Sequence, residues 1–193
     1  MQAAFQYDRY LLKRQVLALT GKFRVYSPDG QLVLYSQQKM FKLKEDIRIF
    51  SDESMMQEVL NIQARQIIDF SAAYDVIDSV YQTKVGALRR KGLRSMMRDE
   101  WEVLDVNDQP LGILQEDSVG YAILRRLLLG ALLPQNYDLL FGDRRVADYK
   151  QRFRFIGYHL DVDFSFDTAR QLDRRLGIAA AILLGTIEGK QSS

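Results

Sequence analysis

The stretch at residues 173–188, DRRLGIAAAILLGTIE, decides the fold of this protein. Residues 176–187 are apolar or small, so a helix over them has no polar face and must be buried on every side. Such a helix extends about 18 Å, whereas crossing the hydrocarbon core of a bilayer takes about 20 residues and about 30 Å. Arg174, Arg175 and Glu188 also bracket the apolar run closely. The sequence therefore predicts a helix enclosed by protein rather than a transmembrane span.

The predicted limits of this central helix come from residues that commonly begin and end helices. Thr168 and Gln171 have the spacing of a capping box, which predicts a helix start near residue 168. Gly189 is a suitable stop, since glycine tolerates the left-handed backbone that often follows a helix. We therefore expect the central helix over about residues 168–188, with alanines and glycines letting other elements approach it closely.

Short alternating runs broken by turn residues dominate the first 117 residues and predict half-buried strands. Asp46–Phe50 is one such run. The clearest turn is Ser27-Pro28-Asp29-Gly30, where proline presets the backbone and glycine tolerates a positive φ. The strand-like runs at residues 23–26 and 32–35 should therefore pair as a hairpin.

The same strand–turn–strand pattern recurs after Trp101 and Tyr137, and more weakly after Tyr74. Counting such runs gives about twelve strands, more than an open twisted sheet usually holds without curling or closing. We therefore predict a mainly β fold with some helix: a closed antiparallel barrel that encloses the central helix. A leucine-rich run ended by Pro134 predicts one connecting helix over about residues 119–133. A chain of 193 residues suits a single domain over residues 1–193.

Composition sets limits on function. Hydrophobic residues make up 47% and charged residues 27% of the chain, which is typical of a folded globular protein. The net charge of +2 gives no indication of nucleic-acid binding. The chain has no cysteine, which excludes disulfides and thiolate zinc sites and suits a reducing compartment. The N-terminus lacks the features of a secretory signal. We therefore expect a cytoplasmic protein, with peripheral membrane association as a further expectation.

The pattern resembles the tubby-like fold of the LURP-one-related and phospholipid scramblase group. The resemblance covers about residues 10–188 and is carried by the repeated aromatic-x-aliphatic hairpins, residues 89–101, and residues 173–176 before the apolar helix. It implies a twelve-stranded barrel around a central hydrophobic helix. Functions in the group include phosphoinositide-dependent membrane tethering, calcium-dependent lipid scrambling proposed for scramblases, and a defence-linked role in plants. The chain lacks the Pro-rich extension and cysteine cluster of eukaryotic scramblases.

The first candidate site is the basic stretch at residues 84–98, which has no acidic residue within it. Arg side chains match phosphate oxygens in pairs, and an anionic membrane attracts each nearby basic residue by about 1 kcal/mol. The alternative is a solvated strand face balanced by Asp99, Glu100 and Glu102. The candidate lipid-headgroup ligands are Lys84, Arg89, Arg90, Lys91, Arg94 and Arg98.

The second candidate is the alternating run at residues 161–167, which is similar to the acidic segment proposed to bind calcium in scramblases. Alternation predicts that Asp161, Asp163 and Asp167 share one strand face, opposite Phe164 and Phe166. Carboxylates suit calcium, but a straight strand spreads them over too great a length to surround one ion. We expect a solvated barrel face and no cofactor, with calcium as the alternative.

The helix expected at residues 119–133 carries leucines together with Arg125 and Arg126, so it suits a membrane interface or a connector that covers the barrel. His159 is the sole histidine and has no partner motif. No nucleophile elbow, phosphate-binding loop, dinucleotide fingerprint or zincin helix occurs. We therefore expect a protein that is not an enzyme.

Three functional hypotheses follow. The leading one is a non-enzymatic module that binds anionic phospholipid headgroups reversibly through the basic stretch. The alternative is a structural or regulatory protein-binding module, in which barrel edges or a surface containing Leu128 and Leu132 dock a protein partner. The third is an enclosed carrier of hydrophobic ligands, against which the filled barrel argues.

Overall fold

The computed structural model describes residues 2–17, 20–39, 46–65, 72–91, 100–117, 134–152 and 157–188. Twelve antiparallel strands form one closed barrel, with a short 3-10 turn before them and a helix after them. The elements are η1 (Ala3–Phe5), β1 (Arg9–Leu17), β2 (Thr20–Tyr26), β3 (Leu32–Lys39), β4 (Asp46–Phe50), β5 (Glu58–Ala64), β6 (Ala73–Asp78), β7 (Thr83–Arg90), β8 (Glu100–Leu104), β9 (Pro110–Glu116), β10 (Asn136–Phe141), β11 (Arg144–Arg152), β12 (Tyr158–Asp163) and α2 (Arg174–Glu188).

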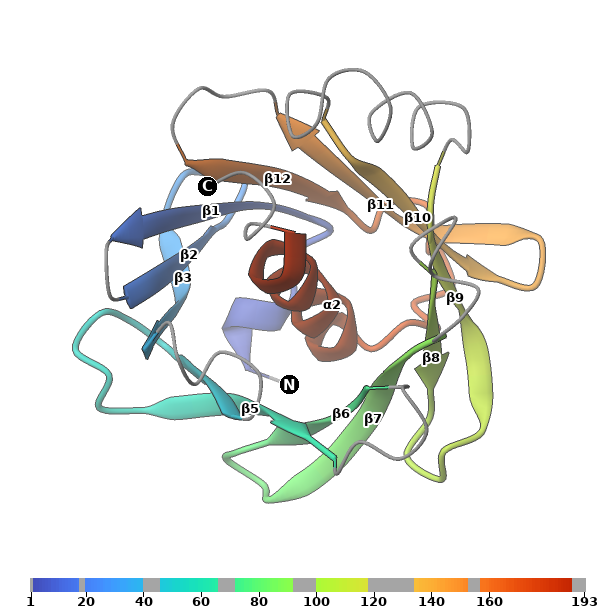
Figure 1. Ribbon diagram of the computed structural model, residues 1–193, viewed down its shortest axis with the longest axis horizontal. Coiled ribbons are helices and arrows are strands. Elements are labelled where there is room, and N and C mark those ends of the chain that lie inside the picture. The colour runs from blue at the N-terminus through green and yellow to red at the C-terminus, as the bar shows by residue number, and fades with distance from the viewer. Residues whose placement is uncertain are drawn as a thin grey trace.

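Each strand pairs with its neighbours in the chain, and β1 pairs with β12 to close the ring. The closing register runs from Arg9 opposite Asp163 to Arg14 opposite Tyr158. When the ring of strands is viewed face-on, α2 lies in its centre with strands on all sides (Figure 1). The predicted closed barrel around a C-terminal hydrophobic helix is therefore confirmed.

The predicted hairpins are also confirmed. Turn residues select these pairings because glycine supplies the positive φ that a tight turn requires, as at Gly30 and Gly142. The cross-strand partners are Val25 with Leu34, Val76 with Gly86, Val103 with Gly112, and Leu139 with Ala147.

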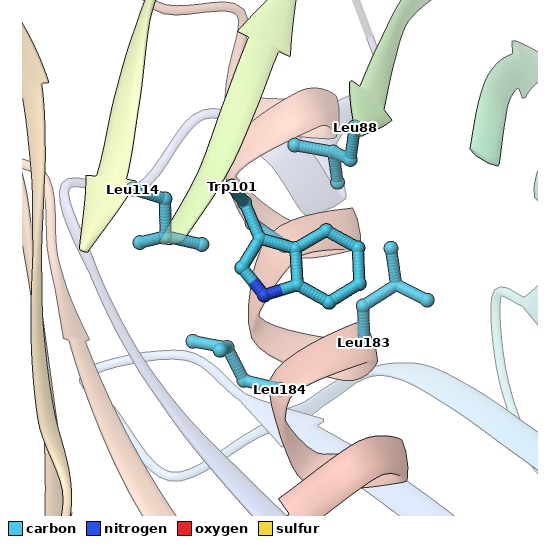
Figure 2. A pocket seen from close by; sticks show the side chains of 6 residues that line it. Leu88, Trp101, Leu114, Leu183 and Leu184 are labelled. Carbon is cyan, nitrogen blue, oxygen red and sulfur yellow. The ribbon is translucent and has the colours of Figure 1, made fainter. Parts of the chain in front are cut away.

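The core consists of the inward side chains of the barrel packed on α2. Residues 178–184 of the helix are all buried, as its uniformly apolar sequence requires. Trp101 of β8 lies against the helix beside Leu88, Leu114, Leu183 and Leu184, and the gap between these side chains has no room for a water molecule (Figure 2). This packing argues against the hypothesis of an enclosed hydrophobic-ligand carrier.

The predicted start of the helix is wrong: α2 begins at Arg174, six residues after Thr168. The carboxylate of Asp167, rather than the hydroxyl of Thr168, accepts hydrogen bonds from the backbone N–H groups of Gln171 (3.0 Å) and Leu172 (2.9 Å). The side-chain amide oxygen of Gln171 accepts a hydrogen bond from Arg144 instead of completing a capping box. An aspartate just before the expected cap therefore folds residues 167–172 into a turn.

The predicted alternation of residues 161–167 is correct only as far as Phe164. β12 ends at Asp163, and the backbone N–H of Asp167 donates to the carbonyl of Phe164 (3.0 Å), which closes a turn. Phe166 is consequently 39% exposed, whereas Asp167 is buried. The prediction that Asp167 shares a solvated face with Asp161 and Asp163 is therefore wrong.

The expected helix at residues 119–133 and the expected stop at Gly189 lie outside the described residues. Within the described part of the chain, no helix is both long and apolar enough to cross a bilayer.

Candidate functional site

The three candidate calcium ligands each contact a different arginine. Asp161 accepts two hydrogen bonds from Arg152, at 2.6 and 2.7 Å, and Asp163 accepts one from Arg9 at 3.0 Å. Asp167 accepts one from Arg174 at 2.9 Å. Over the described ranges, no three acidic or histidine side chains gather as a metal site would require. The structure therefore does not bring these aspartates together.

The described part of the basic stretch faces acidic side chains on neighbouring strands. Arg89 donates to Glu102 through Nε (2.8 Å) and Nη2 (2.5 Å), and the Lys91 ammonium lies 2.6 Å from Glu100. Arg90 lies opposite Trp101 in the register.

Lys84, at the start of β7, pairs with two carboxylates. Its ammonium lies 2.8 Å from Asp108 and 3.3 Å from Asp75. The remaining candidates, Arg94 and Arg98, lie outside the described residues. The described residues therefore agree with the alternative interpretation, in which acidic neighbours balance the basic stretch.

The Arg89–Glu102 pair should contribute little to stability. Both side chains are partly exposed, and ion pairs of this kind usually stabilise by about 0.2–1 kcal/mol. A double-mutant cycle of Arg89→Ala and Glu102→Ala, followed by urea denaturation, should give a coupling energy in that range. A coupling energy above about 2 kcal/mol would mean that the pair behaves as a buried one.

A groove of about 450 Å³ lies on the opposite side of the barrel, over β1, β2, β11 and β12. Its volume is within the usual range of small-ligand sites. We call it the outer groove, and its lining residues are Arg9, Tyr10, Leu11, Lys13, Tyr26, Ser27, Pro28, Gly30, Arg152 and Asp161.

A row of basic side chains crosses four strands, and two of its members, Lys13 and Arg152, line the outer groove. Arg152 of β11 lies opposite His159 of β12, His159 lies opposite Lys13 of β1, and Lys13 lies opposite Arg24 of β2. Cross-strand partners share one face of a sheet, and this face is the outer one because the residues on either side of Lys13 are buried. We call Arg152, His159, Lys13 and Arg24 the basic row.

The cations of the basic row differ in their partners. Arg152 is tied to Asp161, and Arg24 donates to Glu53 at 2.5 Å. Lys13 makes no ion pair with any residue that the structure describes, and its ammonium lies 4.6 Å from the centre of the Tyr26 ring. Among the described members of the row, Lys13 is therefore the cation that an anion could reach without first displacing a carboxylate.

Comparison with known proteins identifies the family. Residues 32–185 match the family model of LURP-one-related proteins. The chain belongs to the LURP-one-related family. A solved X-ray structure of a protein from Arabidopsis thaliana has the same fold, with a TM-score of 0.52 and 11% sequence identity over 94% of this chain and 91% of that chain. At that identity the likeness shows the fold alone. A search of curated proteins found no match.

The sequence of this LURP-one-related protein gave only a weak signal for the outer groove. Arg24, Arg152 and His159 each occur in an alternating run, at positions expected to face solvent, whereas Arg14 breaks the alternation next to Lys13. Their convergence depends on the register of three strand pairs, which a single sequence does not determine. Proximity in the chain favoured the basic stretch because its cations lie close together between residues 84 and 98, although carboxylates on neighbouring strands balance Lys84, Arg89 and Lys91.

Proposed function

We propose that this LURP-one-related protein is a non-enzymatic binding module that associates reversibly with phosphate-bearing anionic lipid headgroups through the outer groove. The observation that carries the proposal is the basic row, in which Lys13 lies between other basic side chains at a groove large enough for a headgroup. Lysine and arginine recognise phosphate through charge and through paired donors respectively. The family resemblance to tubby-like proteins supports the same class of ligand.

The outer groove supports the proposal better than the basic stretch does. In the basic stretch, Lys84, Arg89 and Lys91 each contact one or two carboxylates. A ligand phosphate would have to displace those carboxylates before it could bind. At the outer groove, Lys13 is available without breaking an ion pair with any described residue.

Liposome flotation of matched lysine variants tests the proposal. Wild-type protein should float with vesicles that contain phosphatidylserine or phosphoinositides, and not with pure phosphatidylcholine. Since each basic residue near an anionic surface contributes about 1 kcal/mol, Lys13→Ala should weaken binding about fivefold. Lys84→Ala, which removes the same charge from the basic stretch, should leave binding within about twofold of wild type.

Three results would contradict the assignment in different ways. Equal binding by wild type and Lys13→Ala would remove the outer groove as the site, and selective loss in Lys84→Ala would restore the basic stretch. An absence of flotation with every vesicle would contradict lipid binding altogether. Raising the salt concentration should weaken the binding of wild type, because added ions screen exposed charges.

A protein-interaction module is the second candidate function, and exposed apolar residues on alternate hairpin turns favour it. Met56 is 89% exposed in the β4–β5 turn, Tyr81 is 64% exposed in the β6–β7 turn, and Val106 is 51% exposed in the β8–β9 turn. Alternate connections of an antiparallel barrel lie at one end, so these three turns share that end. Apolar side chains at one end of a barrel suit contact with a protein partner.

A further inference from the structure

Arg14 of β1 is a buried cation inside the barrel. Its side chain points toward α2, and the residue is only 2% exposed. In the register it lies opposite Tyr158 of β12 and Phe23 of β2, and both of these residues are also buried. Its Nη1 donates a hydrogen bond of 2.9 Å to the carbonyl oxygen of Gly185 in the last part of α2.

Contact with the helix accounts for only part of this guanidinium. A cation near the C-terminal end of a helix is favourable because the last carbonyls carry partial negative charge. Nε and Nη2 of Arg14, however, are buried and meet no hydrogen-bond acceptor among the residues that the structure describes. Buried donors without acceptors are costly, and the more so when they carry charge.

The two donors without acceptors, Nε and Nη2, form one edge of the Arg14 guanidinium. Other arginines of this molecule bind carboxylates through the same edge. Arg65 holds Asp75 through Nε (2.8 Å) and Nη2 (2.5 Å). Arg152 holds Asp161 through the same two nitrogens, at 2.6 and 2.7 Å. Two parallel N–H donors match the two oxygens of a carboxylate. No carboxylate of the described residues reaches the corresponding edge of Arg14.

Closely packed aromatic rings surround the Arg14 guanidinium. The Arg14 guanidinium carbon lies 5.6 Å from the centre of the Phe23 ring. A Cβ added at Gly185 would lie 3.0 Å from Phe23 and 3.3 Å from Tyr158, so these rings close tightly on the helix. Burial lowers the pKa of Arg14, but an arginine side chain remains charged at neutral pH.

We propose that the Nε–Nη2 edge of Arg14 is a binding site for the carboxylate of a small organic acid, at the end of the barrel where α2 finishes. Two charge-assisted hydrogen bonds hold the carboxylate, and the rings of Phe23 and Tyr158 provide an apolar wall. The site is distinct from the outer groove, because Arg14 faces inward whereas Lys13 faces outward. Failure of either site therefore leaves the other proposal intact.

The test is a titration of the whole chain with sodium acetate and sodium octanoate against sodium chloride at equal ionic strength and pH 7. Thermal unfolding and the ¹⁵Nε–¹H resonance of Arg14 are followed together. Wild type should show a saturable rise in melting temperature and a matching shift of that resonance. Arg14→Lys keeps the charge but loses the paired donors, so its affinity should fall at least tenfold, and Arg14→Met should lose the response.

Arg170→Met, which removes an exposed arginine, is the matched control and should respond like wild type. Acetate should bind at least as tightly as octanoate, because the side chains around α2 leave little room for a long apolar chain. The proposal is overturned if wild type responds to neither acid beyond chloride, or if Arg14→Met responds as wild type does. If Arg14→Met fails to fold, the Arg14 resonance of wild type still tests the proposal, because an absence of any shift on adding the acids would overturn it.

Discussion

Asp167→Ala should lower the free energy of unfolding by about 3–5 kcal/mol, the loss typical of breaking a buried ion pair by removing one partner. The side chains of Asp167 and Arg174 are 0% and 4% exposed, with 2.9 Å between carboxylate and guanidinium. The same carboxylate holds the backbone N–H groups of Gln171 and Leu172. Its loss would therefore leave a buried arginine poorly compensated and would release the turn before α2. Urea denaturation at pH 7 measures the effect.

Asp161→Ala is the matched control, because it removes the same group from the exposed pair with Arg152. That variant should lose no more than about 1 kcal/mol. An equal loss in both variants would show that burial of the Asp167–Arg174 pair has no special effect on stability.

The stabilisation by Asp167 should also depend on pH. Burial acts to raise the pKa of Asp167, but hydrogen bonds from the backbone N–H groups of Gln171 and Leu172 and from Arg174 hold it below its ordinary value. A carboxyl with a lowered pKa in the folded state stabilises fully above its unfolded pKa of about 3.9. The difference between wild type and Asp167→Ala should therefore shrink as pH falls below about 4.

Gly177→Ala should destabilise the protein by about 1–3 kcal/mol, although alanine is the better helix former by about 1 kcal/mol. An added Cβ would lie 2.5 and 2.6 Å from two carbons of the Phe164 ring. That ring cannot easily move, because it is fully buried and packs edge-on against Tyr10 and Tyr149. Thermal or urea denaturation measures the loss.

Gly185→Ala provides the control for Gly177→Ala, since both positions lie in α2 and gain the same helix propensity. The nearest atom to an added Cβ at Gly185 is 3.0 Å away, so this variant should lose less stability than Gly177→Ala. Adding Phe164→Leu to Gly177→Ala should recover part of the loss beyond additivity. Equal losses for the two glycine variants would contradict the steric explanation.

The sequence predicted the barrel well because its signals were local and strong. The uniformly apolar run in α2 and the turns around Gly30 and Gly142 each specify their own structure. The start of α2 was less predictable, because Thr168 and Asp167 both precede the helix and either could accept backbone hydrogen bonds. Asp167 accepts them, since its carboxylate also pairs with the buried Arg174. The sequence pattern alone does not reveal that Arg174 is a partner of Asp167.

The candidate sites were less predictable than the fold, because they depend on strand register. The basic stretch was conspicuous in the sequence, yet Glu102 lies directly opposite Arg89 and balances it. The outer groove joins residues from β1, β2, β11 and β12, which are far apart in the chain. Arg14 did leave a local signal, since it occupies the same alternate positions of β1 as the buried Tyr10 and Leu12. A charged residue in an apolar register is a reason to look for a partner inside the barrel.

The position of α2 after all twelve strands has a consequence for how the chain is made. The strands emerge first during synthesis, but their inward side chains have no helix to pack on until the last element follows. The Arg175–Asp78 contact spans 97 residues, and the Arg9–Asp163 contact that joins β1 to β12 spans 154. Such long-range contacts form slowly and leave apolar surface exposed in the meantime. The native core can therefore assemble only once residues 174–188 have left the ribosome, and until then the nascent strands expose the apolar surface that α2 covers in the folded protein.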